Sequence, residues 1–181
     1  MKKSHFSVRD MVYCAISAAL ITVCAWIAVP VLQISFTMQT FGIFFTLCLL
    51  GGRRGAVSVL LYLLLGAVGL PVFSAFQGGV SVLLGVTGGY IWGFLLSALL
   101  YLAVTALFGE STPVRVTAAV AGMLLCYGCG TAWYLMSYAQ SGFWAVVSTC
   151  VLPYLVPDTV KIALAFYLAG RLKKALPVIH T

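Results

Sequence analysis

Charged side chains are rare in this chain, and carboxylates are the rarest of them. Charged residues make up 7% of the 181 residues, and the only acids are Asp10, Glu110 and Asp158. Three scattered acids cannot form the clustered carboxylate site that holds Mg²⁺ in metal-dependent membrane transferases. No lysine follows a G-x-x-x-x-G sequence either, so the chain has no P-loop. These absences argue against an enzyme and against ATP hydrolysis by the chain itself.

The residues that replace charge are apolar, and they define the class of protein. Hydrophobic residues account for 63% of the chain, and the mean hydropathy is +1.13. Both values lie far outside the range of water-soluble domains. Because one span needs about 20 apolar residues, the chain has room for about six crossings and for no soluble catalytic domain. We therefore expect residues 1–181 to form a single transmembrane domain in a cell membrane.

Six apolar segments are predicted to be helices, so the expected fold class is all-α. Their continuous apolar character differs from the alternating pattern of barrel strands. The segments are Met11–Val29, Phe36–Leu50, Ala56–Leu70, Tyr90–Phe108, Val114–Met136 and Pro157–Ala169. The second segment is short for a complete crossing.

Lysine and arginine residues gather at every second connection between these segments. By the positive-inside rule, this spacing predicts that both termini are cytoplasmic. The cations concerned are Lys2, Lys3, Arg9, Arg53, Arg54, Arg115, Arg171, Lys173 and Lys174. The net charge of +7 is thus assigned to a cytoplasmic rim that faces the anionic headgroups of the lipid bilayer, and no nucleic acid partner is expected.

Asp158 and Lys161 are opposite charges one helical turn apart inside an apolar segment. Pro157 suits the first position of a helix, so we expect a helix to begin there. Ten residues separate Lys161 from Arg171, which puts the lysine about 15 Å above the cytoplasmic boundary. An unpaired charge at that depth costs about 2.5 to 3.5 kcal/mol. Two interpretations remain open: a structural pair that neutralises itself, or a ligand site in which each group binds part of a solute.

The glycine-rich stretch from Gly69 to Tyr90 is the second candidate region. Its glycines allow the backbone to approach a ligand closely, and its apolar residues make an exposed loop unfavourable. We expect the stretch to fold back over a cavity, with a glycine-rich turn of no binding function as the alternative.

Two shorter patterns have simpler interpretations. Cys126 and Cys129 form a C-x-x-C spacing within an apolar segment, and with no second pair they are interpreted as small buried residues rather than metal ligands. No metal or cofactor is expected. Ala15 and Ala19 form a small-xxx-small pattern on the first segment, which allows another helix to pack closely.

Several sequence blocks together resemble the BioY family, the biotin-specific substrate-binding components of energy-coupling factor (ECF) transporters. The resemblance covers most of the chain, and the blocks occur in the family's order. They are Phe36-Thr-Met-Gln-Thr40, Leu50-Gly-Gly-Arg-Arg-Gly-Ala56, Leu61-Tyr-Leu-Leu-Leu-Gly-Ala-Val-Gly-Leu-Pro-Val-Phe73, Gly85-Val-Thr-Gly-Gly-Tyr90 and Pro157-Asp-Thr-Val-Lys161. Family members usually carry proline where this chain has Val86.

The resemblance implies a six-helix subunit that captures biotin and works with a coupling transmembrane subunit and two cytoplasmic ATPases. It implies that the first-helix motif of Ala15 and Ala19 docks against the coupling subunit. It also implies a prokaryotic membrane protein with Asp158 and Lys161 in its biotin pocket. The chemistry of biotin suggests that Asp158 accepts from the ureido nitrogens, that Lys161 neutralises the carboxylate and that Tyr90 covers the ring. Because the two charged side chains start only about 5 to 6 Å apart, they must splay to reach both polar ends of biotin, or both serve one end. The other residues expected in that pocket are Gln39, Gln77, Gly78, Gly79, Gly88 and Gly89.

Other functions remain compatible with the same residues. A proton-coupled carrier of small acids would use Asp158 as its proton relay, and a membrane enzyme would use Lys161 as base or nucleophile. Another vitamin could also be the substrate.

Overall fold

The chain folds almost entirely into helices, as the sequence predicts. The computed structural model describes residues 6–29, 35–137 and 142–175, so Lys2 and Lys3 of the expected basic rim lie outside the described residues. The elements are α1 (Val8–Trp26), β1 (Ala28–Val29), β2 (Phe36–Thr37), α2 (Gln39–Ala67), η1 (Ser74–Phe76), α3 (Val80–Leu83), α4 (Gly88–Phe108), α5 (Thr112–Ser137), α6 (Phe143–Cys150) and α7 (Leu152–Ala175). The small antiparallel pair of β1 and β2 was not expected.

Five helical stretches in the described part of the chain are long and apolar enough to cross a membrane. They are Val8–Trp26, Gln39–Ala67, Gly88–Phe108, Thr112–Ser137 and Phe143–Ala175. The count differs from six because two predicted segments fall within the single element α2.

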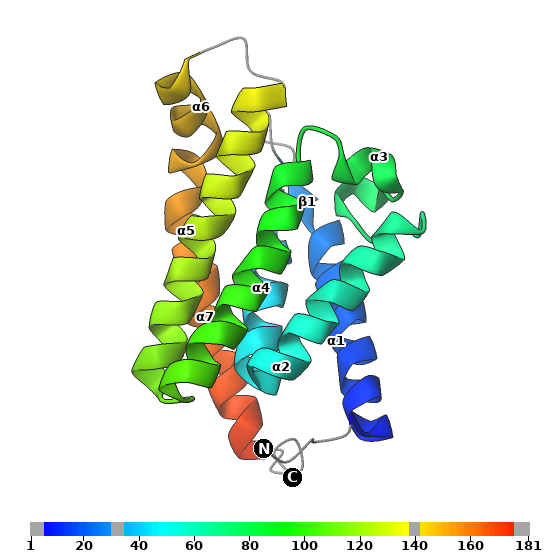
Figure 1. Cartoon of the computed structure of the whole chain (residues 1–181), viewed down its shortest axis with the longest axis vertical. Helices are drawn as coiled ribbons and strands as arrows, with labels where there is room; N and C mark the ends of the chain where they lie inside the picture. The colour runs from blue at the N-terminus through cyan, green and yellow to red at the C-terminus, as the bar shows by residue number, and fades with distance from the viewer. Residues whose placement is uncertain (1–5, 30–34, 138–141, 176–181) are drawn as a thin grey trace.

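A reversal of the chain at Gly51 explains this difference. Gly51 has φ 82° and ψ 174°, a backbone conformation that favours glycine. A Cβ atom on Gly55 would stand 2.9 Å from the Cα atom of Leu47, whereas residues eight apart in a straight helix are about 12 Å apart. The two halves of α2 therefore fold back on each other, as Figure 1 shows. The first half, residues 39–50, is only about 18 Å long, which agrees with the short second segment of the sequence.

The last helix begins earlier than predicted. α7 starts at Leu152, and Pro157 lies inside it instead of at its first position. The backbone N–H groups of Tyr154 and Leu155 bond to the carbonyl of Val151 and start the helix before the proline is reached. Proline is tolerated inside membrane helices because other groups satisfy the backbone. The expectation of a helix start at Pro157 is wrong.

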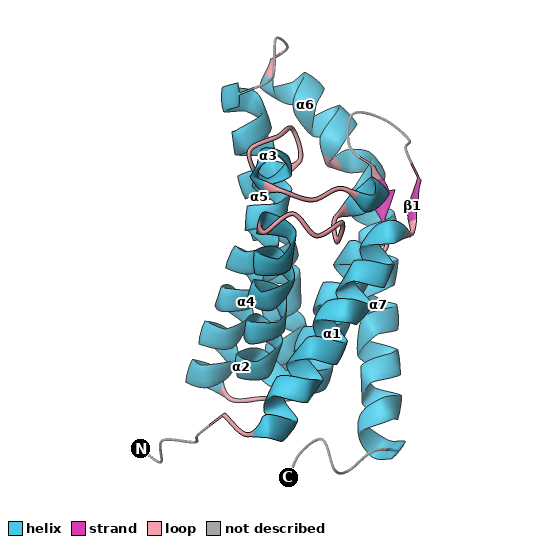
Figure 2. Ribbon diagram, turned by 90° about the vertical axis from the view of Figure 1, so that its right-hand side faces the viewer, coloured by secondary structure: helices cyan, strands magenta, loops and turns pink. Residues whose placement is uncertain are grey.

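The beginning of α1 and the end of α7 lie at one end of the molecule, and β1, β2 and α3 lie at the other (Figures 1 and 2). An ion pair of 2.7 Å between Asp10 and Arg54 joins α1 to α2 at the first end. Asp10 also closes a capping box with Ser7, which fixes the start of α1. The basic residues of the described chain gather at this end, except for Lys161.

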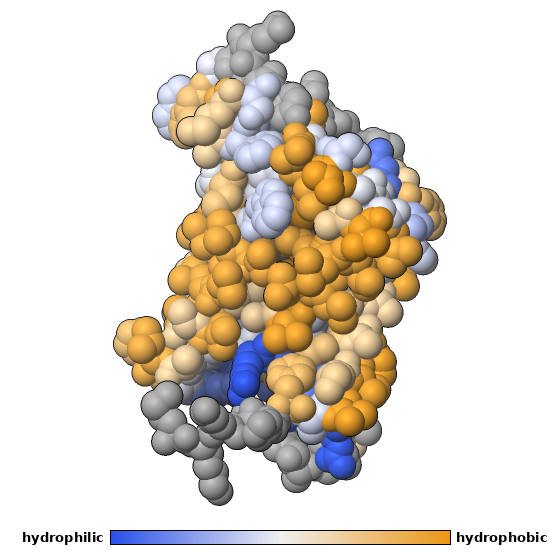
Figure 3. Space-filling view, turned by 45° about the vertical axis from the view of Figure 1, so that its right-hand side comes forward, coloured by the Kyte–Doolittle hydropathy of each residue, from blue (hydrophilic) through white to orange (hydrophobic). Residues whose placement is uncertain are grey.

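One face of the molecule is apolar across its middle. Figure 3 shows a broad hydrophobic band with hydrophilic patches toward the two ends. Exposed large apolar side chains of the described chain include Ile16, Leu64, Leu99 and Leu124. This distribution suits a protein surrounded by lipid.

Candidate functional site

A cavity lies between α2, α4, α5 and α7, on the side of the β1–β2 pair and the loop before α4. Its empty volume, which includes the open space at its mouth, is about 770 Å³. The walls are formed by Ser35, Thr37, Gln39, Thr40, Phe44, Phe73, Ser74, Thr87, Tyr90, Ile91, Phe94, Met123, Cys126, Tyr127, Cys150, Tyr154, Asp158 and Lys161. Apolar and aromatic side chains dominate, with a few polar groups among them.

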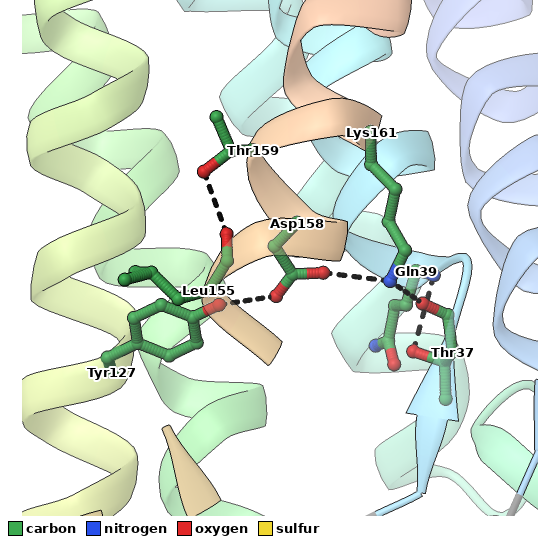
Figure 4. A network of polar contacts seen from close by, with 7 residues as sticks. All are labelled: Thr37, Gln39, Tyr127, Leu155, Asp158, Thr159 and Lys161. Atoms are coloured by element: carbon green, nitrogen blue, oxygen red, sulfur yellow. Dashed lines mark hydrogen bonds and ion pairs between the residues drawn. The ribbon is translucent and has the colours of Figure 1, made fainter. Parts of the chain in front are cut away.

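Asp158 and Lys161 form the charged part of the wall (Figure 4). Both residues are 5% exposed. The Lys161 ammonium donates to one Asp158 oxygen at 2.8 Å, and the Tyr127 hydroxyl donates to the other at 2.6 Å. A carboxylate has about four acceptor positions, so Asp158 keeps capacity for further donors from the cavity.

The β1–β2 pair brings a second partner to Lys161. Antiparallel pairing of Ala28 with Thr37 holds the chain beside α7, and the Thr37 carbonyl accepts from Lys161 Nζ at 2.6 Å. The same ammonium lies 3.7 Å from the centre of the Phe36 ring, a cation–π contact. These contacts hold the ammonium away from lipid and fix its position in the wall.

Gln39 and Tyr90, two of the expected pocket residues, also line the cavity. The Gln39 amide nitrogen donates to the Tyr62 hydroxyl at 2.9 Å, and this bond orients the amide. Tyr90 is 8% exposed, and its ring packs directly on Gly130 of α5, where no side chain fits. Its buried hydroxyl forms no hydrogen bond with the described residues.

The predicted glycines and Gln77 do not form the wall. Gln77 is exposed on the loop, where its backbone bonds to Phe73 and Ser74. Gly78 packs against the Leu70 carbonyl, and Gly79 has φ 96° and donates to the Gly66 carbonyl at 2.7 Å.

Gly88 and Gly89 serve close packing in the same way. A Cβ on Gly88 would collide with the Leu83 carbonyl, and one on Gly89 would collide with Trp133 of α5. The stretch does fold over the cavity, since Phe73, Ser74 and Thr87 line it, but the glycines shape the loop instead of facing the cavity.

Two further predictions concern residues outside the charged wall. Ala15 and Ala19 are exposed on α1, where another helix could reach them. Cys126 is buried, and its thiol contacts the Tyr90 carbonyl at 3.5 Å. No cluster of three metal-ligating side chains occurs among the described residues, although Cys126 and Cys150 do line the cavity.

Sequence reasoning missed Tyr127 and Tyr154 as parts of the wall, and Phe36 as the ring beside the Lys161 ammonium. The one usable signal was the hydroxyl of Tyr127 within an apolar helix, because a buried tyrosine usually finds a polar partner. Phe36 and Tyr154 stack with ring centres 6.3 Å apart, a contact that no local pattern indicates.

Comparison with known proteins identifies the family. The family model described as "BioY family" matches residues 1–178. The chain belongs to the BioY family. One BioY relative, the biotin transporter BioY of Thermotoga maritima, is 37% identical over 92% of this chain and 96% of its own length. The probable biotin transporter BioY of Pyrococcus horikoshii is 36% identical over 91% of this chain and 96% of its own length.

A solved structure supports the same fold. The chain is similar, with a TM-score of 0.82, to the crystal structure of the S-component for biotin from an ECF-type ABC transporter. The match covers 96% of this chain and 95% of that one, at 23% identity. The fold of this BioY member is therefore that of an S-component.

Proposed function

We propose that this chain captures biotin at the outer face of the membrane and delivers it as the substrate-binding subunit of an ECF-type importer. The observation that carries the proposal is the buried, bonded pair of Asp158 and Lys161 in the wall of a largely apolar cavity. A buried ion pair adds little to stability, so its presence favours a role in binding. The names of the family's relatives support biotin as the solute and transport as the activity.

The pair suits the ureido head of biotin. That head has N–H donors beside a carbonyl acceptor, and the wall offers a carboxylate acceptor beside an ammonium donor at 2.8 Å. Since the side chains bond to each other, they do not splay to reach opposite ends of a longer ligand. Both therefore serve the ureido end, which revises the assignment of Lys161 to the carboxylate. Phe44, Tyr90 and Phe94 cover the apolar rings.

The remaining architecture follows from the charge distribution. In the proposed topology the basic end of the molecule is cytoplasmic, with both termini there, and the two halves of α2 and the four other long helical stretches make six crossings. Ala15 and Ala19 dock a helix of the coupling transmembrane subunit, which connects the chain to two cytoplasmic ATPases. Gln77 and the four glycines support the loop over the cavity.

Transport is expected to depend on ATP. Proteoliposomes that hold the chain with its coupling subunit and ATPases should import labelled biotin when ATP is supplied on the ATPase side. Import should persist when a protonophore dissipates the proton gradient, because ATP hydrolysis supplies the driving force in the proposed function. Import by the chain alone that stops with the protonophore would favour the proton-coupled carrier. Chemical turnover of biotin by the purified chain would favour the enzyme instead.

The ester of biotin distinguishes the two assignments of Lys161. Biotin methyl ester keeps the ureido head and lacks the carboxylate charge. Lys161→Met should weaken the binding of biotin and of its methyl ester by the same factor. The expected factor is about tenfold to a hundredfold, the effect of one charged hydrogen bond. Isothermal titration of both ligands against both proteins measures the factors. If the substitution weakens biotin and leaves the ester unaffected, Lys161 binds the carboxylate.

A further inference from the structure

A second hollow lies on the outer surface, and it shares no wall residue with the cavity. It is a groove between α1, the first half of α2 and the last turns of α7, with Leu20, Phe41, Phe45, Leu168 and Leu172 on its walls. The rings of Phe41 and Phe45 stack at 5.6 Å and form one wall. Leu20 and both phenylalanines are only half-buried, so the groove is open from the side.

One end of the groove carries a cation. Arg171 lines the groove near the end of α7, and its guanidinium donates to the Tyr167 hydroxyl at 3.1 Å. The guanidinium also lies 5.5 Å from the centre of the Tyr167 ring, so it is held at the surface. A guanidinium has five N–H donors, and one contact leaves most of them available.

Within the described residues, no side-chain carboxylate neutralises this cation. Asp10 pairs with Arg54, and Asp158 pairs with Lys161. Glu110 lies beside Gly51, where its Oε1 would be 3.0 Å from an added Cβ. Since these are the three acids of the sequence, Arg171 has no carboxylate partner within the described residues.

We propose that the groove binds an anionic phospholipid, with one acyl chain along the phenylalanine wall and the phosphate on Arg171. The charge arrangement selects this occupant, because an apolar trough that ends at an unneutralised guanidinium complements an acyl chain that ends in a phosphate. Arg171 belongs to the basic end of the molecule. Its long side chain can place the guanidinium at the membrane interface, where the lipid headgroups lie. The site is independent of biotin binding.

Native mass spectrometry of the purified full chain, titrated with phosphatidylglycerol or phosphatidylcholine, tests the site. Arg171→Gln should weaken the binding of the first phosphatidylglycerol molecule about fivefold, which is the effect of one cation near anionic lipid. The binding of phosphatidylcholine should not change. Arg9→Gln is the matched control, because it removes the same charge at the same end but outside the groove. It should leave phosphatidylglycerol binding unchanged.

A variant that fills the groove and a competitor without an acyl chain complete the test. Leu168→Trp should reduce phosphatidylglycerol binding by blocking the acyl chain, and glycerol phosphate should not displace the lipid. Equal losses in Arg9→Gln and Arg171→Gln, or displacement by glycerol phosphate, would overturn the proposal. Gel filtration and thermal unfolding without lipid verify folding, and Arg171→Gln decides the matter if Leu168→Trp does not fold. Biotin binding by the parent chain does not depend on this lipid site. A negative result for the lipid therefore leaves the proposed function untouched.

Discussion

The double variant Asp158→Asn with Lys161→Met is expected to bind biotin at least about a hundredfold more weakly than the parent. Two charge-assisted hydrogen bonds to the ureido head are lost, each worth about 1.5 to 3 kcal/mol. The sum corresponds to a factor of roughly 10² to 10⁴ in affinity. Titration calorimetry of the purified chain in detergent measures the loss.

Comparison of Lys161→Met with the double variant separates an effect on biotin binding from an effect on folding. Lys161→Met leaves the Asp158 carboxylate buried without its counter-charge, which costs about 3 to 5 kcal/mol where no other group compensates. The double variant removes both charges and should therefore unfold at a higher temperature than Lys161→Met. A double variant that binds biotin as tightly as the parent would show that the pair is structural.

Thr159 supplies the matched control on the same helix. Its hydroxyl bonds back to the Leu155 carbonyl at 2.7 Å, and Figure 4 shows it pointing away from Lys161 and Gln39. Thr159→Val changes a polar group next to Asp158 without entering the cavity. It should retain the affinity of the parent.

Substitution of Gly130 by alanine is expected to weaken biotin binding about tenfold, because the added methyl occupies the place of the Tyr90 ring. Tyr90 must then move into the cavity or away from its wall. Overpacking of this kind costs about 1 to 3 kcal/mol, which is divided between folding and binding. Calorimetry and thermal unfolding on the same preparation measure both parts.

Gly128, two residues earlier on α5, is the control for this substitution. A Cβ on Gly128 has no neighbour within 4 Å. Gly128→Ala should keep the affinity and raise the stability by up to about 1 kcal/mol, since alanine favours helix. Equal affinities for the two alanine variants would contradict the assignment of Tyr90 to the binding wall.

The charged part of the site could be predicted from sequence because charge is so scarce. An aspartate and a lysine three residues apart in an apolar segment have few explanations, and the structure places both in the cavity wall. Gln39 and Tyr90 were found through family resemblance. Tyr127 was missed, because an aromatic residue in an apolar helix is common and its partner lies 31 residues away on another helix.

The errors in the fold have local causes. Pro157 predicts a helix start because proline favours the first position, but hydrogen bonds from Tyr154 and Leu155 to the Val151 carbonyl begin α7 before the proline. The reversal at Gly51 was expected as a longer connection, and a single glycine with positive φ achieves it. Ligand contact by Gly78, Gly79, Gly88 and Gly89 stays a prediction, because sequence alone cannot distinguish close packing of a loop from close approach to a ligand.

A crystal structure of the purified chain with selenobiotin bound tests the central claim most directly. Selenium replaces the ring sulfur of biotin, so its anomalous signal locates the ligand without assumptions about the density. The account predicts one peak inside the cavity, with the ureido atoms in hydrogen-bonding distance of Asp158 and Lys161. A peak outside this cavity, or a ligand whose carboxylate faces Lys161, would contradict it.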